Sequence, residues 1–314
     1  MNTVYMFSGQ GSQYYQMGLD LFEKNTAFQA HLKSLDQIVR AEFGLSVLDS
    51  IFDPSKKKVD PMDDIELSSA SIFMIEIALA RLVAENGVRP DCVLGASLGS
   101  FAAAAFSGCF AAEEHLISIV RSAQIIKETC PPGAMIAVLG SVDLFQDTQS
   151  LSSLADLAAV NFNEHFTIST SVENLHQVVE LLVAANITHF KLPVNRAYHS
   201  RWIDKAAVPI KSFVQGQIIQ PPTLPMICCA AAGPITRFSE SEVWNIMRDP
   251  ILFAETVQKM EQYGPHRYID IGPSSTLATF LKYILPQGSH SEVVSILGPM
   301  LNGVSNFERL IQKG

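Results

Sequence analysis

Hydrophobic residues follow two different patterns along this chain of 314 residues. Short continuous apolar runs are typical of buried strands, and apolar residues that recur every three or four positions are typical of amphipathic helices. The runs predict strands over 4–7, 92–94, 134–139, 157–161, 166–170, 188–194, 226–231, 268–271 and 293–297. The recurring pattern predicts helices over 14–45, 68–85, 101–106, 113–128, 172–185, 202–218, 239–248, 254–263, 276–284 and 306–312. Because strands alternate with helices, we predict an α/β fold with a central, mostly parallel sheet.

The order of the elements changes in the middle of the chain. Between 133 and 195 the expected order is strand, helix, strand, strand, helix, strand, with the first helix in the less regular segment 142–152. That order is the one found in ferredoxin-like units. We therefore predict a small ferredoxin-like domain at 133–195, inserted into a larger, discontinuous domain made of 1–132 and 196–314.

Composition narrows the class of protein. Hydrophobic residues make up 48% of the chain and charged residues 17%, as in a globular protein with a large core. The net charge of −9 argues against nucleic acid as a partner. No apolar run reaches the ~18–20 residues that cross a bilayer, and the start, MNTVYMFSGQ, lacks the features of a signal peptide. We therefore predict a cytoplasmic protein that is not bound to a membrane.

The five cysteines show no C-x-x-C spacing, and the adjacent pair at 228–229 has no histidine nearby in the sequence. This pattern predicts free buried thiols in a reducing compartment, since disulfide frameworks and metal sites use other spacings. We predict neither a metal nor a cofactor.

The strongest chemical signal is the pentapeptide GASLG at 95–99. It follows a predicted strand and precedes an alanine-rich predicted helix, which is the setting of a nucleophile elbow. In such an elbow the central residue, here Ser97, sits in a sharp turn at a helix N-terminus, where N–H groups favour a developing negative charge. The motif also occurs by chance in surface loops, but the flanking strand and helix favour a catalytic serine.

A serine nucleophile needs a general base, which is most often a histidine. Three of the eight histidines lie in helices among polar neighbours and are predicted on the solvated surface: His31, His115 and His176. His199 follows a strand at the junction of the two predicted domains, where binding clefts form, so we favour it as the base. An ordinary α/β-hydrolase would instead place its base late in the chain, at His266 or His290.

Four motifs, in this order, resemble those of the malonyl-CoA:acyl carrier protein transacylase family, which includes the acyltransferases of polyketide synthases. They are GQGSQ at 9–13, GVRPDCVLGASLG at 87–99, YHS at 198–200 and IDIGP at 269–273. The resemblance covers essentially the whole chain. It implies an α/β-hydrolase-like large domain with a ferredoxin-like insert, and acyl thioesters of acyl carrier protein or of coenzyme A (acyl-CoA) as substrates.

The resemblance also implies roles for individual residues. Ser97 is the expected nucleophile and His199 the expected base, and the backbone N–H groups of Gln10 and Leu98 form the expected oxyanion hole. The backbone carbonyl that orients the histidine is expected at Ile246. The reaction would pass through an acyl-serine, which a second nucleophile, thiol or water, then releases.

The pocket around the serine departs from that of malonyl-selective members of the family. The expected pocket residues are Ala96, Ser69, Ser122, Arg121, Tyr198 and Asn161. Malonyl-selective members bind the substrate carboxylate with an arginine in the helix after the elbow. Aligning the elbow without gaps places Ser122 at that position, and Arg121 then points about 100° away, unless the helix shifts by one residue.

An uncharged acyl group is therefore predicted, because a buried carboxylate without a partner is strongly unfavourable. The group is expected to be larger than malonyl if the small residues Ala96 and Ser69 open space in the pocket. We predict an editing hydrolase that removes non-malonyl acyl groups from acyl carrier protein in polyketide or fatty acid biosynthesis. One alternative is a transacylase that moves malonyl or an unusual acyl unit from coenzyme A to acyl carrier protein. The others are a non-catalytic docking relative and a generic esterase whose base is a late histidine.

Overall fold

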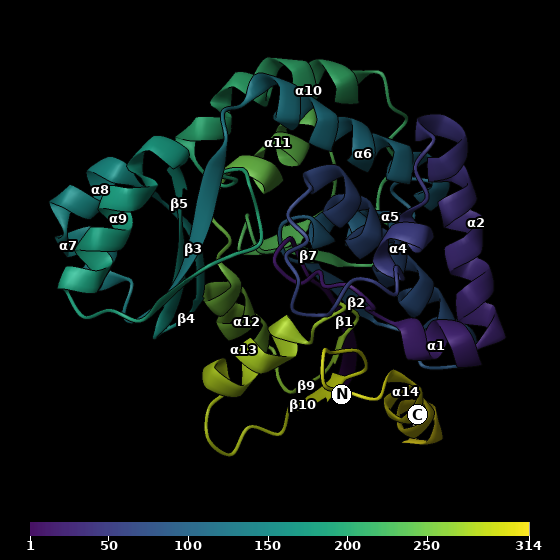
Figure 1. Ribbon diagram of the computed structural model, residues 1–314. Coiled ribbons are helices and arrows are strands. Elements are labelled where there is room, and N and C mark those ends of the chain that lie inside the picture. The colour runs from purple at the N-terminus through teal and green to yellow at the C-terminus, as the bar shows by residue number, and fades with distance from the viewer. Residues whose placement is uncertain (314) are drawn as a thin grey trace.

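The computed structural model describes residues 1–313 and contains two separate sheets. The larger sheet has the strand order β10-β9-β1-β2-β7-β8 (Figure 1). Its strands are β1 (Asn2–Phe7), β2 (Cys92–Gly95), β7 (Met226–Cys228), β8 (Gly233–Ile235), β9 (His266–Asp270) and β10 (Glu292–Ser295). Neighbouring strands run parallel, except that β8 is antiparallel to β7. The predicted α/β fold with a mostly parallel central sheet is confirmed.

Helices cover both faces of the larger sheet, so its central strands are apolar on both sides. In β1, Tyr5 and Phe7 point into one core, and Val4 and Met6 point into the other. The first core is formed with α1 (Leu19–Lys24), α2 (Thr26–Phe43), α3 (Val47–Ile51), α4 (Ile65–Glu85), α5 (Gly99–Phe106), α6 (Ala112–Thr129), the 3₁₀ helix η1 (Arg201–Ala206), α10 (Ala207–Gln215), α11 (Glu240–Arg248) and α14 (Gly303–Lys313). The second core is formed with α12 (Phe253–Glu261) and α13 (Thr276–Ile284).

Helix α4 lies in the middle of the first core (Figure 1). By length and composition it is the one helix among residues 1–313 that is apolar enough to cross a membrane. However, 83% of that apolar stretch is buried inside the protein, against α2, α5 and α6. The apolar character of α4 is therefore explained by its place in the core.

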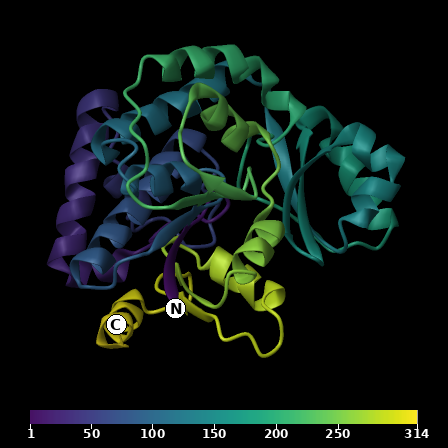
Figure 2. The same cartoon turned by 180° about the vertical axis from the view of Figure 1, so that it is seen from behind.

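The second, smaller sheet has the order β4-β5-β3-β6 and is antiparallel throughout. Its strands are β3 (Gly133–Leu139), β4 (Asp156–Phe162), β5 (His165–Ser171) and β6 (His189–Lys191). One face is covered by α7 (Asp143–Asp147), α8 (Gln149–Leu154) and α9 (Val172–Ala184), as Figure 2 shows from behind. Strand alternation therefore puts Ile136 and Val138 of β3 into that covered core, whereas Met135 and Ala137 face the larger sheet and line pockets there.

The chain enters and leaves the smaller sheet at one place, because the N–H of Gly133 donates to the carbonyl oxygen of Asn195. The element order expected for 133–195 is present, with two short helices in place of the first one. The strand β4 also touches the rest of the chain, since the N–H of Val160 donates to the carbonyl oxygen of Ile251. The exact boundaries of the two domains stay a prediction.

Several predicted elements differ from the observed ones, and three of them have a clear local cause. The helix expected over 14–45 is divided, because the Asn25 side chain caps the start of α2 by accepting the N–H of Phe28. The strand expected over 226–231 ends at Cys228, and the chain then turns back into β8, which the apolar pattern does not reveal. The strand expected over 188–194 shortens to β6, since Pro193 has no N–H to extend the ladder.

Candidate active site

Ser97 occupies the sharp turn between β2 and α5. Its φ of 53° lies in the left-handed region, which a residue with a Cβ adopts only where the surrounding structure holds it. The glycines on either side permit the close packing of this turn. A Cβ on Gly95 would lie 2.3 Å from the Cα of Ser100, and one on Gly99 would lie 2.2 Å from the carbonyl oxygen of Phe7. Strand, turn and helix thus present the serine hydroxyl at the start of α5.

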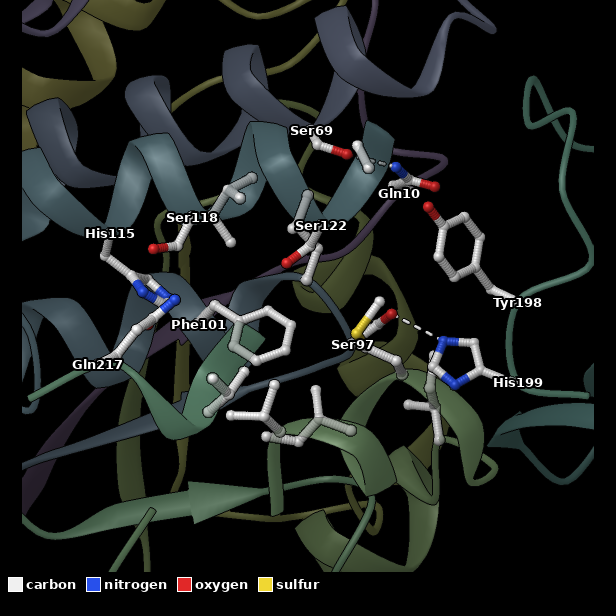
Figure 3. A pocket seen from close by; sticks show the side chains of 18 of the residues that line it. Gln10, Ser69, Ser97, Phe101, His115, Ser118, Ser122, Tyr198, His199 and Gln217 are labelled. Atoms are coloured by element: carbon white, nitrogen blue, oxygen red, sulfur yellow. Dashed lines mark hydrogen bonds between the residues drawn. The ribbon is translucent and has the colours of Figure 1, made fainter. Parts of the chain in front are cut away.

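His199 lies against Ser97, although 102 positions separate them in the chain. The His199 Nε2 is 2.7 Å from the Ser97 Oγ (Figure 3). On the other side of the ring, Nδ1 lies 2.8 Å from the backbone carbonyl oxygen of Asp249. A carbonyl oxygen can only accept, so Nδ1 carries the proton, and Nε2 accepts from the serine hydroxyl. The pair has the geometry of a nucleophile and its general base.

The carbonyl that orients His199 belongs to Asp249, so the prediction of Ile246 is wrong. Helix α11 ends at Arg248, and Asp249 is extended, the conformation favoured before a proline. The extended residue turns its carbonyl out of the helix toward the imidazole, whereas Ile246 is still helical and its side chain lines a pocket. The N–H of His199 also donates to the carbonyl oxygen of Met247, so the end of α11 holds the histidine at two points.

Burial keeps the imidazole of His199 neutral. The residue is 2% exposed, and loss of solvation lowers its pKa to about 4. The hydrogen bond to Asp249 opposes this shift, and the positive charge of Arg248 adds to it. A neutral imidazole can take the proton of the serine hydroxyl. The carbonyl end of α11 then favours the positive charge that forms on the ring.

A glycine-containing loop, 8–13, packs against the elbow. A Cβ added to Gly9 would lie 2.8 Å from the Cβ of Ser97, so only glycine fits at this approach. Within residues 1–313, the backbone N–H groups of Gln10 and Leu98 donate to no other group. Both N–H groups therefore remain available to bind an oxygen of a substrate beside the serine, as an oxyanion hole requires.

A buried carboxyl group anchors the start of this loop. The Oε1 of Glu76, on α4, accepts the N–H of Ser8 at 2.6 Å and its hydroxyl at 3.0 Å. Burial raises the pKa of Glu76 well above its usual value. Sequence reasoning missed this residue, and the available signal was a single acidic residue in the most apolar part of a core helix.

Ser97 stands between two pockets. The inner pocket has a cavity volume of about 70 Å³ and is largely apolar, with lining residues that include Phe101, Ile119, Val214, Val243, Ile246 and Met247 (Figure 3). The outer pocket has a cavity volume of about 150 Å³ and lies toward the smaller sheet, with lining residues that include Ala137, Ala159, Asn161, His165, Thr167 and Phe280. Because Ser97 and Gln10 line both pockets, a molecule bound at the serine has space on either side of it.

Ser122 lines the inner pocket, and Arg121 lies outside it. The Nη2 of Arg121 is 2.8 Å from the Oε1 of Glu42, and its guanidinium group lies over the ring of Phe43. Within the described part of the chain, neither pocket is lined by an arginine or a lysine. The inner pocket therefore offers no cationic side chain to a carboxylate.

The other expected pocket residues divide between the two spaces. Ser69 and Tyr198 line the inner pocket, and Ala96 and Asn161 line the outer one. The Gln10 amide donates to the Ser69 hydroxyl at 2.7 Å, and the Tyr198 hydroxyl lies close to the same amide (Figure 3). Asn161 is bonded to the Nδ1 of His165, 2.9 Å away at the start of β5. Polar groups thus surround the serine on both sides without adding charge.

The prediction of a solvated surface position is wrong for His115. Its side chain is 5% exposed and lines the inner pocket. The ring stacks on Phe110, with the centroids 4.0 Å apart. Its polar sequence neighbours occupy other faces of α6, and helical spacing to Ile119 was the signal for burial. The late histidines lie elsewhere, since neither His266 nor His290 lines the inner or the outer pocket.

The structure offers no obvious metal site. Among residues 1–313, no group of three or more His, Cys, Asp or Glu side chains is arranged to hold a metal ion. The five cysteines are free thiols, and four of them are buried.

Comparison with known proteins gives one consistent result. The model of a family described as the acyl transferase domain matches residues 4–313. The chain is 42% identical to the polyketide biosynthesis acyltransferase homolog BaeD of Bacillus velezensis, over 98% of this chain and 95% of that protein. It is 37% identical to the homolog PksD of Bacillus subtilis, over 97% and 94%. A loading acyltransferase from the avermectin modular polyketide synthase has the same fold, with a TM-score of 0.89 at 22% identity over 99% of both chains.

Proposed function

Because this chain belongs to the acyl transferase domain family, we propose that it is a Ser–His enzyme that hydrolyses non-malonyl acyl groups from acyl carrier protein. The family membership predicted from the four motifs is confirmed by the match over 4–313. The observation that carries the proposal is the 2.7 Å contact between Ser97 and His199, at a pocket without a cationic side chain.

The first half of the reaction transfers the acyl group to the serine. His199 takes the proton of the Ser97 hydroxyl, and the oxygen attacks the carbonyl carbon of the thioester. The N–H groups of Gln10 and Leu98 hold the resulting oxyanion, each contributing on the order of 3 kcal/mol. The carbon–sulfur bond then breaks, and the proton passes from His199 to the departing thiol, which leaves an acyl-serine.

The second half releases the acid. A water molecule gives a proton to His199, and its oxygen attacks the carbonyl carbon of the acyl-serine. The bond to the Ser97 oxygen breaks, and the serine recovers a proton from the histidine, so a free carboxylic acid leaves. A carrier thiol in place of water would produce a transacylase with the same residues.

The two pockets suggest how a substrate lies. The inner pocket is largely apolar and fits an acyl chain, whereas the outer pocket fits the pantetheine arm that links the acyl group to its carrier. With Ser122 in place of a cationic residue, a malonyl carboxylate would be buried without a partner. Such burial is unfavourable by several kcal/mol, which favours uncharged acyl groups.

The substrate preference is directly testable. We expect acetyl and longer acyl groups on acyl carrier protein to be released as free acid, at least about 100-fold faster than malonyl groups, because an unpaired buried carboxylate is so costly. Mass spectrometry of the intact protein and carrier, sampled over time, measures both the acyl-enzyme and the released acid.

Two outcomes would oppose the proposal. A stable malonyl adduct on Ser97 after incubation with malonyl-CoA would show that the pocket accepts a carboxylate. Transfer of the acyl group to an added unacylated carrier, faster than its release to water, would identify a transacylase. Ser122→Arg provides a matched variant, in which the malonyl adduct should increase because the guanidinium group can pair with the carboxylate.

The pH dependence follows from the burial of His199. Only the neutral imidazole accepts a proton, and its pKa is lowered to about 4, so kcat/KM should stay level from pH 8 down to about 5. It should then fall with a midpoint near 4 in steady-state assays of acid release. A midpoint near the ordinary histidine value would contradict the assignment of His199 as a buried base.

Stability has to be followed in the same experiment. Burial lowers the pKa of His199 and also that of His115, to about 3. Both groups take up protons more readily when the chain is unfolded. The contribution of these two histidines to the free energy of unfolding is therefore greatest above the unfolded pKa of about 6.5 and falls as the pH drops toward 4. Circular dichroism at each pH separates lost activity from lost fold.

A further inference from the structure

We infer that the inner pocket selects acyl chains that carry a hydroxyl group far from the thioester, and that His115 binds this hydroxyl. The inference rests on the proposed function and specifies the substrate of the same site. It follows from three observations on α6: a row of polar side chains, an imidazole without partners, and the distance of that imidazole from the serine.

Polar side chains form a row along the wall of an otherwise apolar pocket. His115, Ser118 and Ser122 are spaced by three and four positions, so they lie on one face of α6, and all three line the inner pocket. In Figure 3 they follow one another away from Ser97, with Ser122 nearest and His115 farthest. A pocket for a plain hydrocarbon chain would gain more from apolar residues at these positions.

His115 lacks the hydrogen bonds that a buried imidazole normally makes. Neither ring nitrogen has a partner among residues 1–313, and both atoms are inaccessible to solvent. The ring is enclosed by Phe73, Phe101 and Phe110, none of which can accept or donate a conventional hydrogen bond to it. A buried polar group left unpaired costs about 1–3 kcal/mol, and a group that enters along the pocket can remove that penalty.

A hydroxyl group suits this imidazole better than a charged group does. Burial lowers the pKa of His115 to about 3, so the ring is neutral and has one donor and one acceptor nitrogen. A hydroxyl can satisfy either nitrogen, because it both donates and accepts. The amide of Gln217 lines the same pocket and adds a second neutral polar group. A carboxylate or an ammonium group would find no opposite charge there.

The position of His115 requires the hydroxyl to be remote. His115 and Ser122 are seven positions apart, which corresponds to about 10.5 Å along the axis of α6. A hydroxyl next to the thioester would lie near Ser122 instead. The chains selected are therefore long ones with an oxygen near their far end, which are products of stepwise chain extension with incomplete reduction.

The test compares matched substrates on acyl carrier protein. Wild-type protein is given octanoyl chains with a hydroxyl near the far end, with a hydroxyl next to the thioester, and with none. We expect kcat/KM to be at least about tenfold higher for the chain with the remote hydroxyl than for the plain chain, because one hydrogen bond to a buried group changes the affinity by about that factor. In His115→Phe the ratio between these two substrates should fall to about one.

Controls keep the result interpretable. His176→Phe makes the same change at an exposed histidine on α9, paired with Glu180, and should keep the wild-type ratio. If His115→Phe does not fold, as judged by circular dichroism, His115→Met replaces it. An unchanged ratio in a folded His115 variant, or no preference in wild type, overturns the inference.

The outcomes also separate this inference from the proposed function. If wild-type protein releases acetyl groups and forms an acyl-Ser97 but shows no preference for the hydroxylated chain, only the inference fails. If no acyl group of any kind reaches Ser97, the proposed function itself fails.

Discussion

Replacing Ser97 with alanine is expected to lower the rate of acyl release by at least about 10⁴-fold, because the variant has no oxygen that can form the acyl-enzyme. The residual rate would come from the N–H groups of Gln10 and Leu98, which still polarise the thioester. Intact-protein mass spectrometry after mixing with acetyl-carrier protein measures the adduct, and chromatography of the released acid measures turnover.

The matched control for this variant is Ser55→Ala, which removes an exposed serine in a loop between α3 and α4. It should form the same adduct at the same rate as wild type. Acid release by Ser97→Ala at the wild-type rate would mean that another group carries the chemistry. A folded wild-type protein that never acquires an acyl adduct and never releases acid would identify a docking relative without catalysis.

Replacing His199 with alanine is expected to lower the rate by about 10³–10⁴-fold or more. The serine would keep its hydroxyl but would have no acceptor for the proton, so both acylation and deacylation would slow. Single-turnover experiments with acyl-carrier protein separate the two steps. The loss of the Asp249 contact removes a link between two chain segments, so the fold of this variant has to be checked by thermal unfolding.

Two further variants serve as controls for the His199→Ala prediction: His176→Ala and His266→Ala. His176 is exposed on α9, and His266 lies at the start of β9 beside Glu261, outside both pockets. We expect near-wild-type turnover from His176→Ala in every assay. Strong loss in His266→Ala together with retained turnover in His199→Ala would support the generic esterase and reject the present assignment.

Much of the architecture could be predicted from the sequence, because it depends on interactions between residues close together in the chain. The apolar runs of β1 and β2 follow from burial on both faces of a covered sheet. The turn at Ser97 follows from the glycines at 95 and 99, where a larger residue would collide with Ser100 or Phe7. Element ends were less predictable, as the Asn25 cap and the short strand β6 show.

The site could be predicted only in part, for a physical reason that Asp249 illustrates. A backbone carbonyl carries no signature in the sequence, and whether it reaches His199 depends on where α11 ends and how the next residue turns. The same limit applies to Glu76, whose contact with Ser8 spans 68 positions.

The sequence alone determined the family and the absence of an aligned arginine, and it predicted Ser97 as the nucleophile, because each of these depends on consecutive residues. Only the tertiary structure decided that Arg121 pairs with Glu42 outside the inner pocket and that His115 lies inside it. Both residues are on α6, and a helix presents neighbouring positions to different surroundings. Which surroundings those are depends on the elements packed around α6, and that packing is set by residues far away in the chain.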